Sequence, residues 1–211
     1  LTHIRLQDED ARAFHLATLH LELAENARYE ATWLGVGARL ARTELHARLR
    51  GAHSDLRLTA AQLARAHQHT DLTSVIAHDA PSCGSRQLVR SVLAGHARGV
   101  FQGRIEVARA AQKTDGYQMN QTLLLSPEAE SDSKPELEIF ADDVKCSHGA
   151  TVGELDAEQL FYLRSRGIAP DDARAILVRA FLDEVLQTAA DDGARAMLEA
   201  AVQNWPMKDA A

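Results

Sequence analysis

Two segments of the chain repeat one another without a gap, and this repeat constrains the fold more than any other feature. Residues 95–107 align with residues 127–139, and each copy has a small residue, a predicted turn and then apolar residues at every second position. The aligned pairs are Ala97 with Ala129, Gly103 with Pro135, Ile105 with Leu137 and Val107 with Ile139. A strand–turn unit of this size cannot bury its apolar face alone, so the repeat predicts stacked strands, in a β-solenoid or in a β-sandwich. Chance similarity between two hairpins is the alternative.

Composition and spacing favour different structures in the first 150 residues. Ala, Leu and Arg are abundant there, and all three favour helix. Apolar and polar residues nevertheless alternate in short runs, which is the pattern of a strand that buries one face. The alternating pairs include Ile4 with Leu6, Leu56 with Leu58, Ile105 with Val107 and Leu137 with Ile139. We therefore predict strands, with turns at Gly35, Gly37, Gly51, Gly95, Gly99, Gly103 and Pro135.

A helical pattern replaces the alternation near residue 153. Asp156 with Gln159 three residues later forms a capping-box signal, and Pro170 suits the first turn of a second helix. The predicted helices begin after Asp156, at Pro170 and near Asp191 or Asp192, and they end near Gly167, Ala189 and Trp205. The change of pattern predicts a β-rich core domain at residues 1–153 and a helical domain at residues 154–211.

Several classes of protein are disfavoured. The formal net charge of −7 argues against nucleic acid as the main partner, because phosphate binding needs a basic surface. The chain has no run of about 18 apolar residues, so no transmembrane helix is predicted. The start at Leu1 has neither an apolar signal region nor an initiator Met, so we expect a cytoplasmic protein whose beginning is missing from this chain. The segment from Gly95 to Gly103 lacks the Gly-Lys-Ser/Thr of a phosphate-binding loop, so no nucleotide site is predicted.

The segment around Cys146 carries the strongest candidate chemistry. Cys146 and His148 are two residues apart, so a strand would place both side chains on one face, with Lys145 pointing away. A thiolate and an imidazole on one face can hold a soft or borderline metal. A buried structural Cys beside a polar His is the favoured alternative, and a Cys–His nucleophilic pair is a third possibility, although no oxyanion-hole signature accompanies it. The chain has two cysteines, Cys83 and Cys146, which are too few for the four thiolates that usually hold an iron–sulfur cluster.

A second group of possible metal ligands is His67, His69 and His78, which lie near Asp71 and Asp79 in the sequence. Imidazole and carboxylate groups bind zinc or iron, but this spacing fits no standard metal-binding motif. Polar residues at the surface or at the edge of the core are the favoured interpretation.

Several longer motifs follow one another in the second half of the chain. They are Ala111–Gln118, Asn120–Leu125, Lys134–Ile139, Asp142–Gly153 and Gln159–Ile168. In this order they closely resemble the C-terminal half of SufD-type members of the SufB/SufD family, which are scaffolds for iron–sulfur cluster assembly. The close resemblance runs from about Phe101 to Glu184. The SufB type has further cysteines after the Asn-Gln motif, whereas residues 123–126 have none, so the SufD type is more similar.

The resemblance implies a right-handed parallel β-helix core followed by a C-terminal helical region, with the family's N-terminal helical region absent from this chain. It implies a non-catalytic scaffold that pairs with a SufB-like chain through the β-helix cores and docks a SufC-like ABC-type ATPase at its helical end. Cys146 and His148 would then lie where a nascent iron–sulfur cluster forms, shared with the partner chain and not stably bound by the isolated chain. The expected docking residues for the partner ATPase are Phe161, Tyr162 and Phe181.

Three alternatives remain open at this point. A β-helix enzyme is one, although the short repeats of an acyltransferase and the clustered acids of a polysaccharide-active enzyme are not found. A metal-binding protein that uses Cys146 and His148 is another. The third is a structural partner of a SufB-like chain that contributes no cluster ligand. Open sheet edges also give a solenoid reason to pair, so the isolated chain could form a homodimer.

Overall fold

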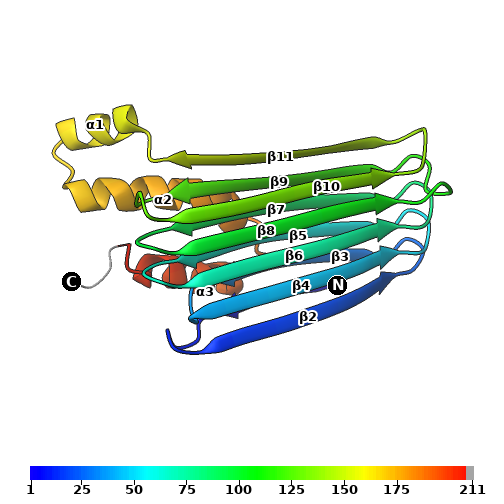
Figure 1. Cartoon of the computed structure of the whole chain (residues 1–211), viewed down its shortest axis with the longest axis horizontal. Helices are drawn as coiled ribbons and strands as arrows, with labels where there is room; N and C mark the ends of the chain where they lie inside the picture. The colour runs from blue at the N-terminus through cyan, green and yellow to red at the C-terminus, as the bar shows by residue number, and fades with distance from the viewer. Residues whose placement is uncertain (208–211) are drawn as a thin grey trace.

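Two parallel β-sheets lie face to face and form most of the molecule (Figure 1). The computed structural model describes residues 1–207. One sheet has six strands in the order β1-β3-β5-β7-β9-β11, and the other has five in the order β10-β8-β6-β4-β2. The six-stranded sheet contains β1 (Thr2–Gln7), β3 (Arg28–Gly35), β5 (Asp55–Ala64), β7 (Gly84–Leu93), β9 (Asp115–Leu124) and β11 (Lys145–Glu154). The five-stranded sheet contains β2 (Phe14–Leu23), β4 (Leu40–Leu49), β6 (His69–His78), β8 (Arg98–Val107) and β10 (Glu130–Ile139).

The chain crosses from one sheet to the other after every strand, so successive turns stack into a β-solenoid of about five turns. The two copies of the sequence repeat lie on neighbouring strands of this stack, and their aligned residues are paired. β10 pairs with β8 so that Glu130 lies opposite Arg98 and Ile139 lies opposite Val107. The predicted fold class, mainly β with a solenoid core followed by helices, is confirmed, and the alternative of a sandwich is not needed.

The predicted turns at Gly35, Gly99, Gly103 and Pro135 are wrong, because all four residues lie within strands. At the strand ends the chain reverses instead through residues with a left-handed backbone, of which only Gly95 is a glycine. The others with positive φ in the loops are Asn26, Ala38, His53, Ala66, Ser82 and Lys113. Turn prediction from glycine missed these positions because non-glycine residues take that conformation at a modest energetic cost when the stacked rungs impose it.

Inward-facing residues from both sheets form the core. The fully buried apolar side chains include Leu45, Leu49, Leu56, Leu58, Ile76, Phe101 and Ile105. Polar side chains are buried among them and are bonded to one another across the interior. The Ser74 hydroxyl donates to Gln87 Oε1 at 2.6 Å, and the Gln62 amide donates to Thr70 Oγ1 at 2.8 Å. The interior is therefore a layered core in which these buried polar side chains are paired with one another, which offsets their desolvation.

Three helices follow the solenoid, as predicted: α1 (Ala157–Ser165), α2 (Pro170–Leu186) and α3 (Asp192–Asn204). The Asp156 carboxylate accepts hydrogen bonds from the backbone N–H groups of Glu158 and Gln159, so the predicted cap is present. Gly167 ends the first helical segment with φ of +85°. The predicted helical domain extends to residue 211, and its last four residues lie outside the described part.

The helices α2 and α3 pack on the outer face of the six-stranded sheet, and this contact fixes the helical region to the solenoid. Val178, Leu182 and Leu198 of the helices share one apolar cluster with sheet residues that include Leu34, Leu63 and Val92. Arg90 of β7 donates to the Phe181 carbonyl and pairs with Glu184, both on α2. In contrast, α1 has no buried residues.

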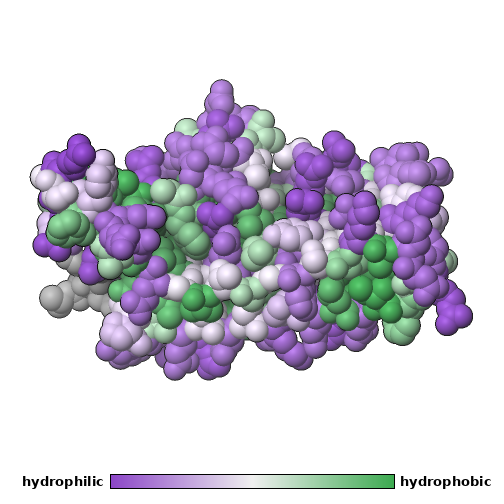
Figure 2. Space-filling view, turned by 90° about the horizontal axis from the view of Figure 1, so that it is seen from above, coloured by the Kyte–Doolittle hydropathy of each residue, from purple (hydrophilic) through white to green (hydrophobic). Residues whose placement is uncertain are grey.

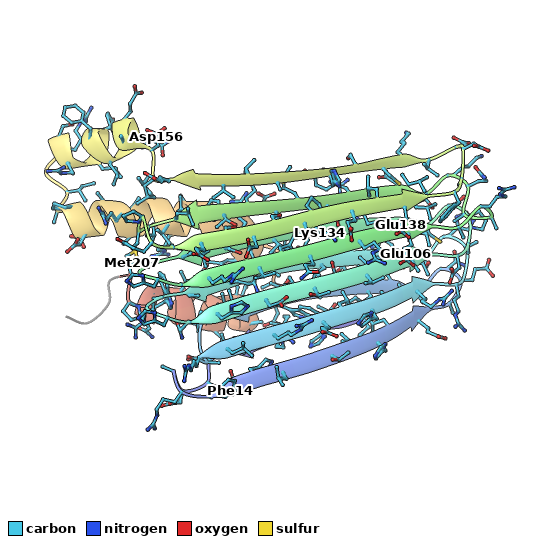
Figure 3. All side chains as sticks on the ribbon, in the orientation of Figure 1. Phe14, Glu106, Lys134, Glu138, Asp156 and Met207 are labelled. Carbon is cyan, nitrogen blue, oxygen red and sulfur yellow. The ribbon has the colours of Figure 1, made fainter. Side chains whose placement is uncertain are left out.

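The outer face of the five-stranded sheet is charged, and Figure 3 shows Glu106, Lys134 and Glu138 on it. Its charges are paired along and across the strands, as in Arg98 with Asp132 at 2.6 Å and Lys134 with Glu136 at 3.0 Å. Exposed pairs of this kind contribute little stability each, and we interpret this face as solvated. Within residues 1–207, no helix is both long and apolar enough to cross a membrane.

Gly103 sits in the middle of β8 where a side chain cannot fit. A Cβ atom there would lie 2.5 Å from Gln118 Oε1 and 2.6 Å from Phe101 Cζ, whereas one at Gly153 would meet nothing within 4 Å. We expect Gly103→Ala to lower the free energy of unfolding by about 1–3 kcal/mol through overpacking. Gly153→Ala is the matched control and should change it by less than about 0.5 kcal/mol. Denaturant unfolding measures both, and equal effects would contradict the close packing at Gly103.

Candidate functional site

Cys146 and His148 lie on β11, the last strand of the six-stranded sheet. β11 pairs with β9 so that Cys146 is opposite Gly116 and His148 is opposite Gln118, whose side chain is in the interior. The strand is regular, so both residues face the interior side of the sheet, while Lys145 and Ser147 face outward. The expected shared face of Cys146 and His148 is therefore present in the fold.

The solenoid ends at this rung, and its interior side is open there. β10 and β11 have strand neighbours on one side only within the described chain. Residues that would be covered by a further turn are exposed instead: Ile139 is 39% exposed, Phe140 65% and Val152 51%. Figure 2 looks onto this end, and a hydrophobic patch is visible at the end of the face where β10 finishes and β11 begins. We call the surface formed by Ile139, Phe140, Cys146, His148 and Val152 the open end.

Cys146 occupies an apolar environment at the open end. Its side chain is half-buried and packs against a cluster that contains Ile105, Val107 and Ala141. Burial raises the pKa of the Cys146 thiol, the carboxylate of Asp115 raises it further, and a hydrogen bond with the backbone of Gly116 acts in the opposite direction. A raised pKa keeps the thiol protonated at neutral pH, so Cys146 is a poor nucleophile unless a metal displaces its proton.

His148 is exposed, in contrast to its neighbour two residues before. The Cys146 thiol interacts with the backbone of Gly116 and with Asp115, and none of the hydrogen bonds among residues 1–207 joins it to His148, so the geometry does not favour a Cys–His nucleophilic pair. An exposed imidazole at the mouth of the solenoid is accessible to a metal without rearrangement of the core.

The residues beneath the open end are polar and bonded, and sequence reasoning did not identify them as part of the site. Gln118 accepts from the Gln87 amide at 3.3 Å and donates to the backbone carbonyls of Gly103 at 3.1 Å and Glu136 at 3.4 Å. The Asn120 amide donates to Ser133 Oγ at 3.0 Å, and its Oδ1 is buried without a partner. A sequence signal existed, because Gln118, Asn120 and Thr122 are polar at the alternate positions where β9 faces inward.

The histidine and aspartate group in and around β6 is not a metal site. His78 is fully buried and its Nε2 lies 2.8 Å from Ser85 Oγ, while the ring of His67 stacks on that of His96. The carboxylate of Asp79 is bonded to Arg48, and that of Asp71 is bonded to Thr73. Burial lowers the pKa of His78 to about 4, so this imidazole is neutral. No group of three or more potential ligands that could hold a metal occurs anywhere in the described chain.

The predicted docking residues divide into two environments. Phe161 and Tyr162 lie on α1 and are 74% and 56% exposed. They line an open groove of about 850 Å³ between α1 and α2, together with Ile176 and Leu177. Phe181 is partly buried, and the guanidinium of Arg90 lies 5.0 Å from its ring centroid, so it belongs to the contact between α2 and the sheet. Phe161 and Tyr162 are therefore the accessible members of the predicted set.

Comparison with known proteins gives one consistent result. The family model described as "SUF system FeS cluster assembly, SufBD core domain" matches residues 1–181. The chain is 42% identical over 193 residues to the iron–sulfur cluster assembly protein SufD of Escherichia coli, which covers 92% of this chain and 46% of that protein. It is 39% identical to an iron–sulfur cluster assembly SufBD family protein of Synechocystis, over 88% of this chain and 41% of the relative. It is also 38% identical to the chloroplastic protein ABCI7 of Arabidopsis thaliana, over 89% of this chain and 40% of the relative. The chain thus spans about half the length of the curated relatives that it matches.

The two cysteines should differ in reactivity. Cys83 is 1% exposed, so iodoacetamide should label Cys146 and leave Cys83 unmodified in the folded protein. The labelling rate of Cys146 should still rise at a pH where an unburied cysteine has reached its plateau, because burial raises the pKa of its thiol. Peptide mass spectrometry after timed labelling measures both rates, with Cys146→Ser as the control for specificity. A rate that reaches its plateau near neutral pH would contradict this environment and would indicate an activated thiolate.

Proposed function

This chain belongs to the SufBD core family of the SUF system for iron–sulfur cluster assembly, and we propose that it acts as a scaffold that offers Cys146 and His148 to a nascent cluster at the open end of its solenoid. The observation that carries this proposal is the position of both side chains on the last, uncovered rung. The cluster is the cargo of the scaffold. Two side chains cannot complete the coordination of a cluster, so the remaining ligands come from a partner chain.

The partner at the open end is a second solenoid of the SufB-like type. β10 and β11 present unpaired strand edges, and Ile139, Phe140 and Val152 expose apolar surface beside them. Unpaired edges next to apolar side chains favour strand addition by another chain. A partner with a similar final rung would cover this surface and bring its own ligands opposite Cys146 and His148. In the isolated chain, a second copy can occupy the same edge.

His148 is the first ligand to act in this scheme, because its imidazole is exposed and needs no rearrangement. Cys146 can join only after it loses its proton, which metal binding promotes and its apolar surroundings oppose. Gln118 and Asn120 lie beneath these two side chains. Gln118 donates to the Glu136 carbonyl and Asn120 donates to Ser133 Oγ, so these bonds fix the positions of β9 and β10 below the site.

The helical end provides the second docking surface, for a SufC-like ABC-type ATPase. Phe161 and Tyr162 expose aromatic rings beside the groove between α1 and α2, and aromatic side chains next to a groove are typical of protein interfaces. β11 ends at Glu154 and α1 begins at Ala157, so the docking helix is joined almost directly to the strand that carries Cys146 and His148. A pull on α1 by the ATPase when it binds ATP would therefore act on the assembly site.

One specific observation favours a second function. Cys146 packs among Ile105, Val107 and Ala141 and keeps a raised thiol pKa, as a structural cysteine would. In that case the chain shapes the interface, and the partner supplies every cluster ligand.

The variant His148→Ala distinguishes these two functions. We expect the full-length protein, co-expressed with its SufB-like and SufC-like partners and purified anaerobically, to lose most of its iron and sulfide in this variant while the complex remains intact. Ser147→Ala is the matched control, because Ser147 lies between the two candidate ligands but faces outward. Unchanged iron and sulfide in His148→Ala would favour the purely structural role, and loss of the complex would place His148 in the interface packing.

The docking of the ATPase should depend on Phe161. Phe161→Ala removes an exposed ring, so it should weaken binding of the SufC-like subunit about tenfold or more without lowering thermal stability. Arg164→Gln on the same helix is the control, because Arg164 does not line the groove. Binding of the purified ATPase to the full-length variants is measured by titration calorimetry. Equal affinities for the two variants would exclude the groove as the docking surface.

A further inference from the structure

The two strands that border the open end differ in the backbone groups that they leave free. Along a strand, the N–H and C=O groups of successive residues point to opposite sides, so in an outermost strand half of them face away from the sheet. At the start of β10, the Glu130 N–H donates to the Ala97 carbonyl at 2.9 Å. Just after its end, the Phe140 N–H donates to the Val107 carbonyl at 2.9 Å. The even-numbered residues of β10 therefore bond to β8, and the odd-numbered residues direct their N–H and C=O groups to the free edge.

Pro135 removes a donor from the middle of this free edge. It pairs in register with Gly103, and the pairing of β10 with β8 continues on both sides of it. The pairing is undisturbed because residue 135 is odd-numbered, so the N–H group that proline lacks would face away from β8. The outward side chains of β10 include Lys134 and Glu138, which are charged (Figure 3). Proline and charged residues protect an edge strand against pairing, so β10 cannot accept a continuous added strand.

β11 has an uninterrupted free edge. The Lys145 N–H donates to the Thr114 carbonyl at 2.8 Å, so the odd-numbered residues of β11 bond to β9. The residues whose backbone groups face the free edge are Cys146, His148, Ala150, Val152 and Glu154. None of them is proline, and the outward side of the strand includes Gly149 and Gly153, which leave space for close approach. β11 can therefore accept an added strand along its whole length.

We propose that a strand of the SufB-like partner adds to the free edge of β11, and that Pro135 prevents the edge of β10 from forming a second continuous ladder. This inference rests on the proposed function, because it assigns the contact that holds the partner at the open end. Cys146 and His148 contribute their own N–H and C=O groups to the new ladder. The register of the added strand therefore determines which side chains of the partner lie beside these two candidate ligands.

Proline substitutions at two neighbouring residues of β11 test this assignment. Ala150→Pro removes an N–H group that faces the free edge, whereas Thr151→Pro removes one that bonds to β9, and both side chains are exposed. We expect Ala150→Pro in the full-length protein to weaken binding of the purified SufB-like partner at least tenfold. Thr151→Pro is the matched control for strand disruption and should lower the melting temperature much more than Ala150→Pro. Titration calorimetry on iron-free proteins measures the affinity, and an unchanged affinity in Ala150→Pro would overturn the proposal.

Hydrogen exchange of the wild-type full-length protein gives an independent result that does not depend on how the variants fold. The amides of His148, Ala150 and Val152 should exchange rapidly in the free protein and at least tenfold more slowly with the partner bound, and those of Ser133 and Leu137 should slow much less. Mass spectrometry with fragmentation to single amides measures these rates. Slow exchange along β11 in the free protein would show that another part of the chain or a second copy covers this edge. Equal protection of both strands would show that Pro135 does not interrupt the interface.

Either of these two results would overturn the assignment of the edge. Neither measurement involves iron or sulfide, so both are separate from the cluster content of His148→Ala. Failure of the edge test together with cluster loss in His148→Ala would leave the scaffold function standing with a different partner contact. A wild-type protein that does not bind the SufB-like chain would overturn the proposed partner and this inference together.

Discussion

The structure depends on parallel stacking, in which each strand pairs with the strand two positions along the chain and each rung covers the inward side chains of the one before it. Such a fold covers the inward side chains of every interior rung. The rung of β10 and β11 is followed by helices and not by a further strand, so it exposes side chains that would be core residues in an interior rung. Cys146 and His148 belong to this rung. The candidate site therefore lies where the repeat gives way to the helices, because an interior rung leaves no room for a ligand.

The buried polar layer gives the open end a rigid base. Gln87 and Gln118 bond to each other inside the solenoid, and Gln118 continues to the backbone of β8 and β10. Since a buried amide loses free energy when it moves away from its partners, these bonds fix the spacing of the two sheets directly below His148. Gly103 is part of the same arrangement, because only a residue without a side chain leaves space for Gln118 and Phe101. The two sheets are therefore held at a fixed spacing beneath the open end.

The sequence predicted the parts of this structure that depend on local or repeated patterns. The register of β8 and β10 followed from the gapless repeat, and the helix starts followed from Asp156 and Pro170, because caps and alternation act over a few residues. The turns were predicted in part. Gly37, Gly51 and Gly95 lie between strands as expected, whereas the predicted turns at Gly35, Gly99, Gly103 and Pro135 fall within strands. No sequence signal indicated Ala38, His53 and Ala66, because they adopt left-handed backbones that their residue types do not favour. Arg5 and Thr43, or Asn120 and Ser133, meet only through the crossing between sheets, so their contacts could not be predicted from sequence spacing. The pairing of Cys146 with His148 on one face was predicted, but the half-burial of one and the exposure of the other depend on where the solenoid ends.

The way in which each helix is attached to the solenoid determines which strands move when a force acts on that helix. The apolar face of α2 and the contacts of Arg90 fix this helix to the six-stranded sheet. A displacement of α2 would therefore have to move β5 and β7, and each of these strands is paired on both sides. α1 has no buried residue, and it follows β11 after a two-residue connection. β11 is paired on one side only and contributes little to the core apart from Cys146. Of the contacts between the helical region and the solenoid, the weakest therefore run through α1 to the strand that carries Cys146 and His148. A force on α1 displaces β11 and the open end before it disturbs the rest of the fold.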